Sequence, residues 1–167
     1  MRTQSGFALI TALIFLVLMT LLGVAMFNGF TLDQIMAGNL REKSRALDAS
    51  QTAINTAESW LSISSNATDG VVCATGLYAG AQVCSNAVPT QTWPWTTGTA
   101  FTPTGMSVAL SGTGTYAALP MYYIQVLSPP GAATKYYRIT AAASGGNNSA
   151  VAIVETVFRV SQQTRQL

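Results

Sequence analysis

Apolar residues form one long run near the start of the chain. From Phe7 to Phe27 the only residues that are not apolar are Thr11, Thr20 and Gly23. The run has twenty-one residues, and about twenty suffice for a helix to cross the hydrocarbon core of a bilayer. A secretory signal peptide has a shorter apolar region, of roughly 7–15 residues, followed by a small-residue cleavage site that is missing here. The pattern therefore predicts a membrane-spanning helix half over residues 7–32.

An amphipathic pattern begins at Leu32 and predicts the second half of the same helix over residues 33–61. No proline occurs between Phe7 and Leu61, so one continuous helix of about 80 Å is expected at 1.5 Å per residue. Charged residues occupy the opposite face, and we interpret them as solvated or as subunit contacts. Spacings of three, four and seven place the apolar residues on one face: Leu32, Met36, Leu40, Leu47, Ile54, Ala57 and Leu61, with Lys43 and Ser50 interrupting.

The remaining residues, 62–167, are expected to form a head. Residues 62–119 are rich in Thr, Ser, Gly and Ala without clear periodicity, which predicts a variable loop. Residues 120–160 contain three runs rich in β-branched and aromatic residues, bounded by Gly, Pro and Asn clusters that are typical of strands and hairpins. The predicted fold class is α+β: a long N-terminal helix packed on a C-terminal antiparallel sheet of three to four strands. The expected core-facing positions are Ile124, Val126, Tyr137, Ile139, Ala141, Val154, Phe158 and Val160.

Composition argues against catalysis. Charged residues make up only 8% of the chain, against about 25% in typical soluble domains. The absence of histidine removes the commonest general base and metal ligand. Only Lys43 and Lys135 could replace it, one on the helix and the other at the edge of a predicted strand. A net charge of +2 without a basic cluster predicts no direct nucleic-acid binding. We therefore predict no enzyme, no cofactor and no metal site.

The polar residues that precede the apolar run set the expected orientation. Residues 1–6 contain one charge, Arg2, and the positive-inside rule keeps such a segment in the cytoplasm. The head then lies outside the cytoplasm, where disulfides form and persist. Cys73 and Cys84 are eleven residues apart, without tight metal-ligand spacing. A disulfide is the preferred interpretation, and free thiols remain the alternative.

Two tryptophans stand out within the predicted loop, in the sequence Trp93-Pro94-Trp95. Exposed aromatic pairs are common in the energetic centres of protein interfaces, so Trp93 and Trp95 are a candidate partner surface. The alternative is that they cover the hydrophobic core beneath the loop. Substituting both by Ala would separate these interpretations.

The junction Gly6-Phe7 resembles the type III signal of prepilins, in which a short basic leader ends in Gly and an uncharged helix begins with Phe. The resemblance implies that a prepilin peptidase cleaves after Gly6 and that the new N-terminal Phe7 is N-methylated. The leader would then be residues 1–6. An ordinary signal anchor with an incidental Gly-Phe pair is the alternative.

Two further segments resemble minor pilins of the PilX type. Residues 36–41 read MAGNLR, and an Ala-Glu step follows at Ala57-Glu58. An earlier step of this kind is expected, but Ala49-Ser50-Gln51 lacks its glutamate. Near the C-terminus, residues 137–141 (YRITA), a Gly-Gly pair and a strand ending in VFRV also match this type. The resemblance implies a pilin architecture, with other minor and major pilins, a prepilin peptidase, an inner-membrane assembly platform and a tip adhesin as partners.

Thr11 occupies the fifth position after the expected cleavage site, where major pilins carry a glutamate. The resemblance therefore implies a minor pilin that helps to initiate or cap a type IV pilus. Its expected location is the bacterial inner membrane, in contact with lipid and with the C-terminus in the periplasm, and then the pilus tip or shaft. The pilus would serve adhesion, twitching motility or another task of the whole filament. Alternatives are a pseudopilin of a type II secretion system and a signal-anchored adhesion or binding domain.

Overall fold

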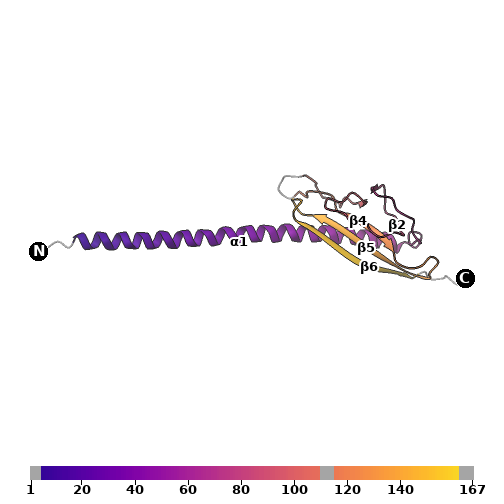
Figure 1. Ribbon diagram of the computed structural model, residues 1–167, viewed down its shortest axis with the longest axis horizontal. Helices are drawn as coiled ribbons and strands as arrows, with labels where there is room; N and C mark the ends of the chain where they lie inside the picture. Colours follow the sequence, from indigo (N-terminus) through magenta and orange to yellow (C-terminus); the bar gives the residue numbers. More distant parts are fainter. Residues whose placement is uncertain (1–4, 110–114, 162–167) are drawn as a thin grey trace. The chain divides into compact units, whose positions relative to one another are not determined.

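One helix accounts for more than a third of the chain. The computed structural model describes residues 5–109 and 115–161 (Figure 1). Helix α1 runs Ser5–Ser62, which confirms the single long helix predicted from the sequence. The chain forms two compact units, the first ending at Leu40 and the second beginning at Arg41. Residues 1–4 of the expected leader lie outside the described residues, as do residues 110–114 and 162–167.

Three long antiparallel strands in the second unit match the predicted ones closely. They are β4 (Met121–Val126), β5 (Thr134–Ser144) and β6 (Val151–Ser161). In Figure 1 they lie alongside the last turns of α1. Ile124 of β4 pairs with Ile139 of β5, which pairs with Thr156 of β6. The order of the strands and their hairpin connections therefore follow the predicted pattern.

The sheet is larger and more mixed than expected. The predicted loop over residues 62–119 contributes β1 (Leu77–Tyr78), β2 (Val83–Cys84) and β3 (Gly98–Ala100). The sheet order is β1-β3-β4-β5-β6, and β2 also pairs with β4. Strands β3 to β6 form the predicted antiparallel sheet of three to four strands. The β1–β3 and β2–β4 pairs are parallel, so two short strands from the predicted loop extend it into a mixed sheet. Strands of two or three residues are too short for a periodic pattern, and here they depend on partners distant in sequence.

The core of the second unit lies between α1 and the inner face of the sheet. Tyr137 and Ile139 on β5, which lies between β4 and β6, are fully buried. All eight predicted core-facing strand residues belong to this core, although the three on β6 are only partly buried. Burial of each large apolar side chain contributes about 1.5–3 kcal/mol relative to leaving it exposed. The helix contributes Ala53, Ile54, Ala57 and Leu61, with Trp60 at the margin.

The helix face that meets the sheet differs from the predicted stripe. Four residues of that stripe are 41–72% exposed: Leu32, Met36, Leu40 and Leu47. Ser50, expected to interrupt the stripe, is fully buried. Its hydroxyl donates a hydrogen bond to the Leu47 carbonyl (2.8 Å), so it needs no partner on the sheet. The buried face consists mainly of small residues, which allow the sheet to approach the helix backbone closely: Ala46, Ala49, Ser50, Ala53 and Ala57. Counting large apolar residues alone missed this face.

Candidate functional site

The first unit presents apolar side chains on all sides of α1. Phe7, Leu16 and Phe27 are 72%, 63% and 75% exposed, and their apolar neighbours are similar. Within the described residues, α1 is the one helix that is long and apolar enough to cross a membrane, and its apolar stretch is not buried inside the protein. A helix that is hydrophobic all round belongs in a membrane or in the core of a larger assembly. This surface is therefore the first candidate functional site.

Thr11 lies in this apolar half and has its hydroxyl satisfied locally. The Thr11 hydroxyl donates to the carbonyl oxygens of Phe7 (3.1 Å) and Ala8 (3.0 Å), both one turn earlier in α1. The residue is half-buried by its neighbours. A neutral side chain bonded to its own helix demands no charged partner in an apolar environment. Gly6 and Phe7, the expected processing positions, both lie in the first turns of α1.

A cluster of charges ties the sheet to the helix where the second unit begins. The Glu42 carboxylate accepts a hydrogen bond from the backbone N–H of Gly146 and pairs with the Arg45 guanidinium (3.0 Å). The Gly146 N–H, followed by Arg45, lowers the pKa of Glu42. Arg45 also donates to the Thr115 carbonyl (2.7 Å) and lies over the Tyr116 ring, 4.6 Å from its centre. The turn after β5 is thus fixed to α1 by a charged clamp.

The glycines of this turn make the clamp sterically possible. A Cβ atom on Gly145 would lie 2.5 Å from the Glu42 carbonyl oxygen and 2.8 Å from its carboxylate. Both distances are shorter than real Cβ contacts allow, and the first partner is backbone that cannot rotate away. Lys43 adds a further contact by donating to the Val151 carbonyl at the start of β6. Absence of a side chain at Gly145 therefore lets the hairpin turn touch the helix.

A second ion pair holds the other end of the sheet. The buried Lys135 ammonium pairs with Asp69 (2.8 Å) and donates to the Ala67 carbonyl (3.2 Å). Lys135, followed by the Gly131 N–H, lowers the pKa of Asp69. Burial, with a smaller contribution from Asp69, raises the pKa of Tyr137 to about 12. The Tyr137 hydroxyl donates to the Thr68 carbonyl (2.9 Å), so these contacts fasten the segment after α1 to β5.

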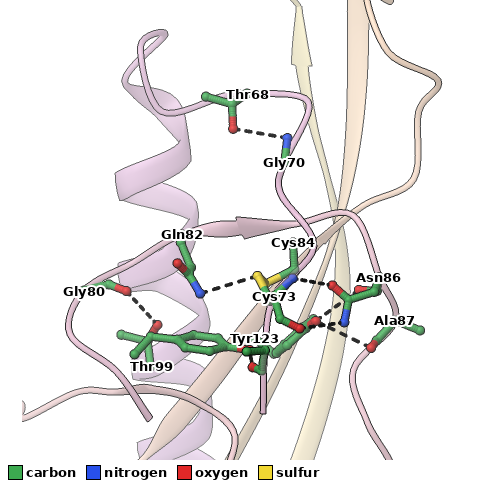
Figure 2. Close-up of a disulfide and its surroundings, with 12 residues drawn as sticks. Thr68, Gly70, Cys73, Gly80, Gln82, Cys84, Asn86, Ala87, Thr99 and Tyr123 are labelled. Atoms are coloured by element: carbon green, nitrogen blue, oxygen red, sulfur yellow. Dashed lines mark hydrogen bonds between the residues drawn. A yellow bond between two sulfur atoms is a disulfide. The ribbon is translucent and has the colours of Figure 1, made fainter. Parts of the chain in front are cut away.

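Cys73 and Cys84 form the predicted disulfide (Figure 2), with their Cα atoms 5.4 Å apart. The Asn86 side chain bridges the same loop, accepting from the Cys73 N–H (2.8 Å) and donating to its carbonyl (3.2 Å). The Tyr123 hydroxyl, reaching from β4, donates to the Asn86 carbonyl (3.1 Å). Burial raises the pKa of Tyr123 to about 12. The disulfide loop is therefore anchored to the central sheet.

The two tryptophans lie against the outer face of the sheet. Trp95 is buried at 7% exposure and packs in a cluster with Met121 and Ala142, and Trp93 is half-buried beside it. This placement favours the core interpretation for Trp95. Binding of a partner by Trp93 stays a prediction.

The sequence pattern predicted a solvated face for the polar residues of α1, and the clamp was not predicted. Glu42 and Arg45 are three residues apart and pair with each other. Their backbone partners in the head are distant in sequence: Gly146 is 104 residues from Glu42, and Thr115 is 70 residues from Arg45. The adjacent glycines Gly145 and Gly146 were the available signal. They indicated a turn, but not that the turn touches the helix.

A long N-terminal helix with an exposed apolar half, followed by a head built on an antiparallel three-stranded core, defines a pilin-like protein. Comparison with family models supports this class along most of the chain. The model described as PilX N-terminal matches residues 5–59, and the model described as type IV pilus assembly protein PilX C-term matches residues 80–160. The chain belongs to the PilX family of type IV pilus assembly proteins. Comparisons with curated proteins and with solved structures found no significant match.

Membership in this family identifies the chain as a minor pilin of type IV pilus assembly. The family consists of pilus structural and assembly proteins and is not a known enzyme family. It implies interaction with other pilus components. The apolar half of α1 fits anchoring in a membrane, followed by incorporation into the pilus.

Proposed function

We propose that this minor pilin acts at an end of the filament, where it helps to initiate or cap type IV pilus assembly. The observation that carries the proposal is Thr11. Major pilins have a glutamate at the corresponding position, which is thought to pair with the N-terminal amine of a neighbouring subunit. Thr11 is neutral, and within the described part of the chain its hydroxyl bonds to carbonyls of its own helix. A subunit without that buried charge pair is better suited to a terminal position than to the repeating body of the filament.

Processing by a prepilin peptidase is part of the proposal. Cleavage after Gly6 would leave Phe7 as the N-terminal residue and remove the only charge before Asp33, Arg2. The Phe7 carbonyl, which accepts from Thr11, is retained after this cleavage. Intact mass spectrometry of the protein from its native membrane tests the step. Loss of residues 1–6 with one added methyl group is expected, and a retained leader would contradict the prepilin assignment.

The proposed mechanism exchanges one apolar environment for another. Before assembly, the exposed apolar side chains of α1 contact lipid in the inner membrane, with the head in the periplasm. During assembly the same side chains contact the helices of other pilins, so apolar surface is kept from water in both states. Extraction from the membrane is assigned to the assembly platform and its cytoplasmic motor, as the family implies. The pilus tip, with or without an adhesin, is the expected destination.

Clean deletion in the native host is the functional test. If the protein is a priming subunit, its deletion should strongly reduce the number of surface pili and change the structure of each pilus little. Complementation with the Thr11→Ser variant should restore piliation, because the hydroxyl and its helix bonds are kept. Immunogold labelling should place the wild-type protein at filament ends, whereas Thr11→Glu should increase its share along the shaft. Normal piliation in the deletion strain would exclude a priming role.

A further inference from the structure

Strand β6 forms a long open edge of the sheet. It has eleven residues and lies at one end of the strand order, next to β5 (Figure 1). Among residues 5–109 and 115–161, no other strand pairs with it. Its core-facing residues Val154, Phe158 and Val160 are only half-buried. The residues that pair with them on β5 are at most 5% exposed. An edge of this length is a template for adding another strand.

The hydrogen-bond phase of the sheet shows which residues point outward at this edge. The Gly145 N–H donates to the Ala150 carbonyl (2.8 Å) at the start of the β5–β6 pair. Residues of an antiparallel pair alternate between bonded and non-bonded positions, so the odd-numbered residues from Val151 to Ser161 direct their backbone groups away from β5. Two contacts agree with this assignment. Lys43 of α1, which is not part of β5, donates to the Val151 carbonyl. The Tyr136 carbonyl, opposite Arg159, accepts from the Leu127 N–H rather than from β6.

The same odd-numbered residues carry an alternating pattern of side chains on the outer face. Ile153 and Val157 are 59% and 56% exposed. Glu155 between them and Arg159 after Val157 are also exposed. Glu155 contacts Arg138 of β5 (3.2 Å) but keeps about half of its side chain in solvent. The edge thus presents apolar, acidic, apolar and basic side chains in turn.

We propose that β6 pairs antiparallel with β6 of a second copy of this chain, about a two-fold axis at Val157. In this register Val157 faces Val157, and Glu155 of each copy faces Arg159 of the other. Both charge pairs are attractive, and every residue involved has outward-directed backbone groups. A register centred on Glu155 or on Arg159 would oppose like charges, which destabilises a cross-strand pair. Charge complementarity therefore selects a second copy and a single register.

The inner face of the joined sheets is complementary in the same register. Val154 lies opposite Val160, and Thr156 lies opposite Phe158. These are the side chains that the open edge leaves half-buried, so pairing would complete their burial. An isologous contact of this kind closes on itself and forms a dimer rather than an extended fibre.

The two-fold symmetry fixes the relative direction of the two copies. A two-fold axis perpendicular to the sheet reverses the direction of the segment of α1 from Arg41 to Ser62 that packs under each sheet. The two copies in the pair therefore face opposite ways. This contact is distinct from packing within one filament, in which all subunits point the same way, and it does not rest on a role at the filament end.

Site-specific cross-linking of the full-length protein in detergent tests the register. With Cys73 and Cys84 paired in a disulfide, a Val157→Cys variant supplies the reactive thiol. Mild oxidation should join two copies, because directly paired residues lie about 5.5 Å apart. Ile153→Cys is the matched control on the same face, since it lies opposite Ser161 and about 27 Å from its counterpart along the strands. Equal cross-linking of both variants, or none with Val157→Cys, would overturn the proposal.

Charge variants in the Val157→Cys background sharpen the test. Arg159→Glu alone and Glu155→Lys alone each place two like-charge pairs in the dimer, so each should lower the cross-linked yield by about tenfold. Mixing the two variants should restore it, because both charge pairs become attractive in the mixed dimer only. Circular dichroism of each variant verifies that the head is folded. Unchanged yields for the single variants, or no recovery on mixing, would refute the proposed register.

Discussion

The two units use one helix in opposite ways. Before Leu40 the apolar side chains of α1 are exposed, so this unit is completed only by lipid or by other subunits. After Arg41 the helix turns a face of small residues toward its own sheet, and Tyr137, Ile139 and Leu61 are fully buried. Apolar content therefore does not by itself identify a core. The first unit exposes apolar surface that needs lipid or another subunit to cover it, whereas the second unit buries its apolar side chains through its own contacts.

The largest expected effect comes from placing a charge in the first unit. Leu16 is 63% exposed, and a lysine at the centre of a membrane helix costs about 2.5–3.5 kcal/mol on insertion scales. Leu16→Lys should strongly reduce membrane insertion and incorporation into pili without changing the unfolding of the head. Membrane fractionation and thermal unfolding of the purified protein measure the two effects separately.

The matched controls keep either the position or the charge. Leu16→Met retains an apolar side chain and should insert normally. Thr52→Lys adds the same charge on the exposed face of α1 in the second unit and should also insert normally. If Thr52→Lys impaired insertion as strongly as Leu16→Lys, the contrast between the two halves of the helix would be lost.

The second prediction concerns the core of the second unit. Tyr137 is fully buried and its hydroxyl is bonded, whereas its neighbour Tyr136 is 44% exposed. Tyr137→Ala should lower the free energy of unfolding by about 3–5 kcal/mol, as for other large aromatic truncations in cores. Tyr136→Ala should lower it by about 1 kcal/mol or less. Denaturant unfolding followed by near-ultraviolet circular dichroism measures both, and equal losses would contradict the assigned core.

Periodicity made most of this fold predictable. The helix and the three long strands have enough residues to show their repeats, and the alternation in residues 137–141 correctly identified the buried face of β5. The short strands β1, β2 and β3 carry no such repeat, because two or three residues cannot define one. The predicted helix stripe was wrong at its first four large apolar residues, since the contact with the sheet depends on small residues that hydrophobicity alone does not distinguish. Those four are Leu32, Met36, Leu40 and Leu47, all of which are exposed.

In the candidate site too, features with a local sequence pattern were predictable and features that depend on distant residues were not. The apolar surface of the first unit follows directly from the sequence, and the Cys73–Cys84 disulfide followed from the expected compartment. The clamp could not be predicted, because Glu42 and Gly146 are 104 residues apart, and the glycine pair indicates a turn without indicating what the turn contacts. Long-range polar contacts depend on the completed fold, whereas an apolar helix surface does not.

The third prediction probes this clamp through its backbone. A Cβ atom on Gly145 would overlap the Glu42 carbonyl oxygen at 2.5 Å, so Gly145→Ala should destabilise the head by about 1–3 kcal/mol. Gly80→Ala is the control, because nothing lies within 4 Å of the added atom. It should change stability by about 0.5 kcal/mol or less. Membrane insertion should be unaffected in both, and similar stability losses would argue against the close contact with Glu42.

The smallest expected effect is a dependence of head stability on acid. The folded-state pKa values of Glu42 and Asp69 are lowered by their partners, so their stabilising contributions are present above the unfolded-state values near 4. Stability should fall as the pH drops from about 5 through the folded-state pKa values, because the unfolded chain then binds more protons. Glu42→Gln keeps the shape of the side chain but removes one titrating group. It should lower stability at pH 7 by about 1 kcal/mol and weaken the acid dependence, leaving the part due to Asp69. An acid dependence identical to that of the unmodified protein would show that the clamp at Glu42 contributes no charge-dependent stability.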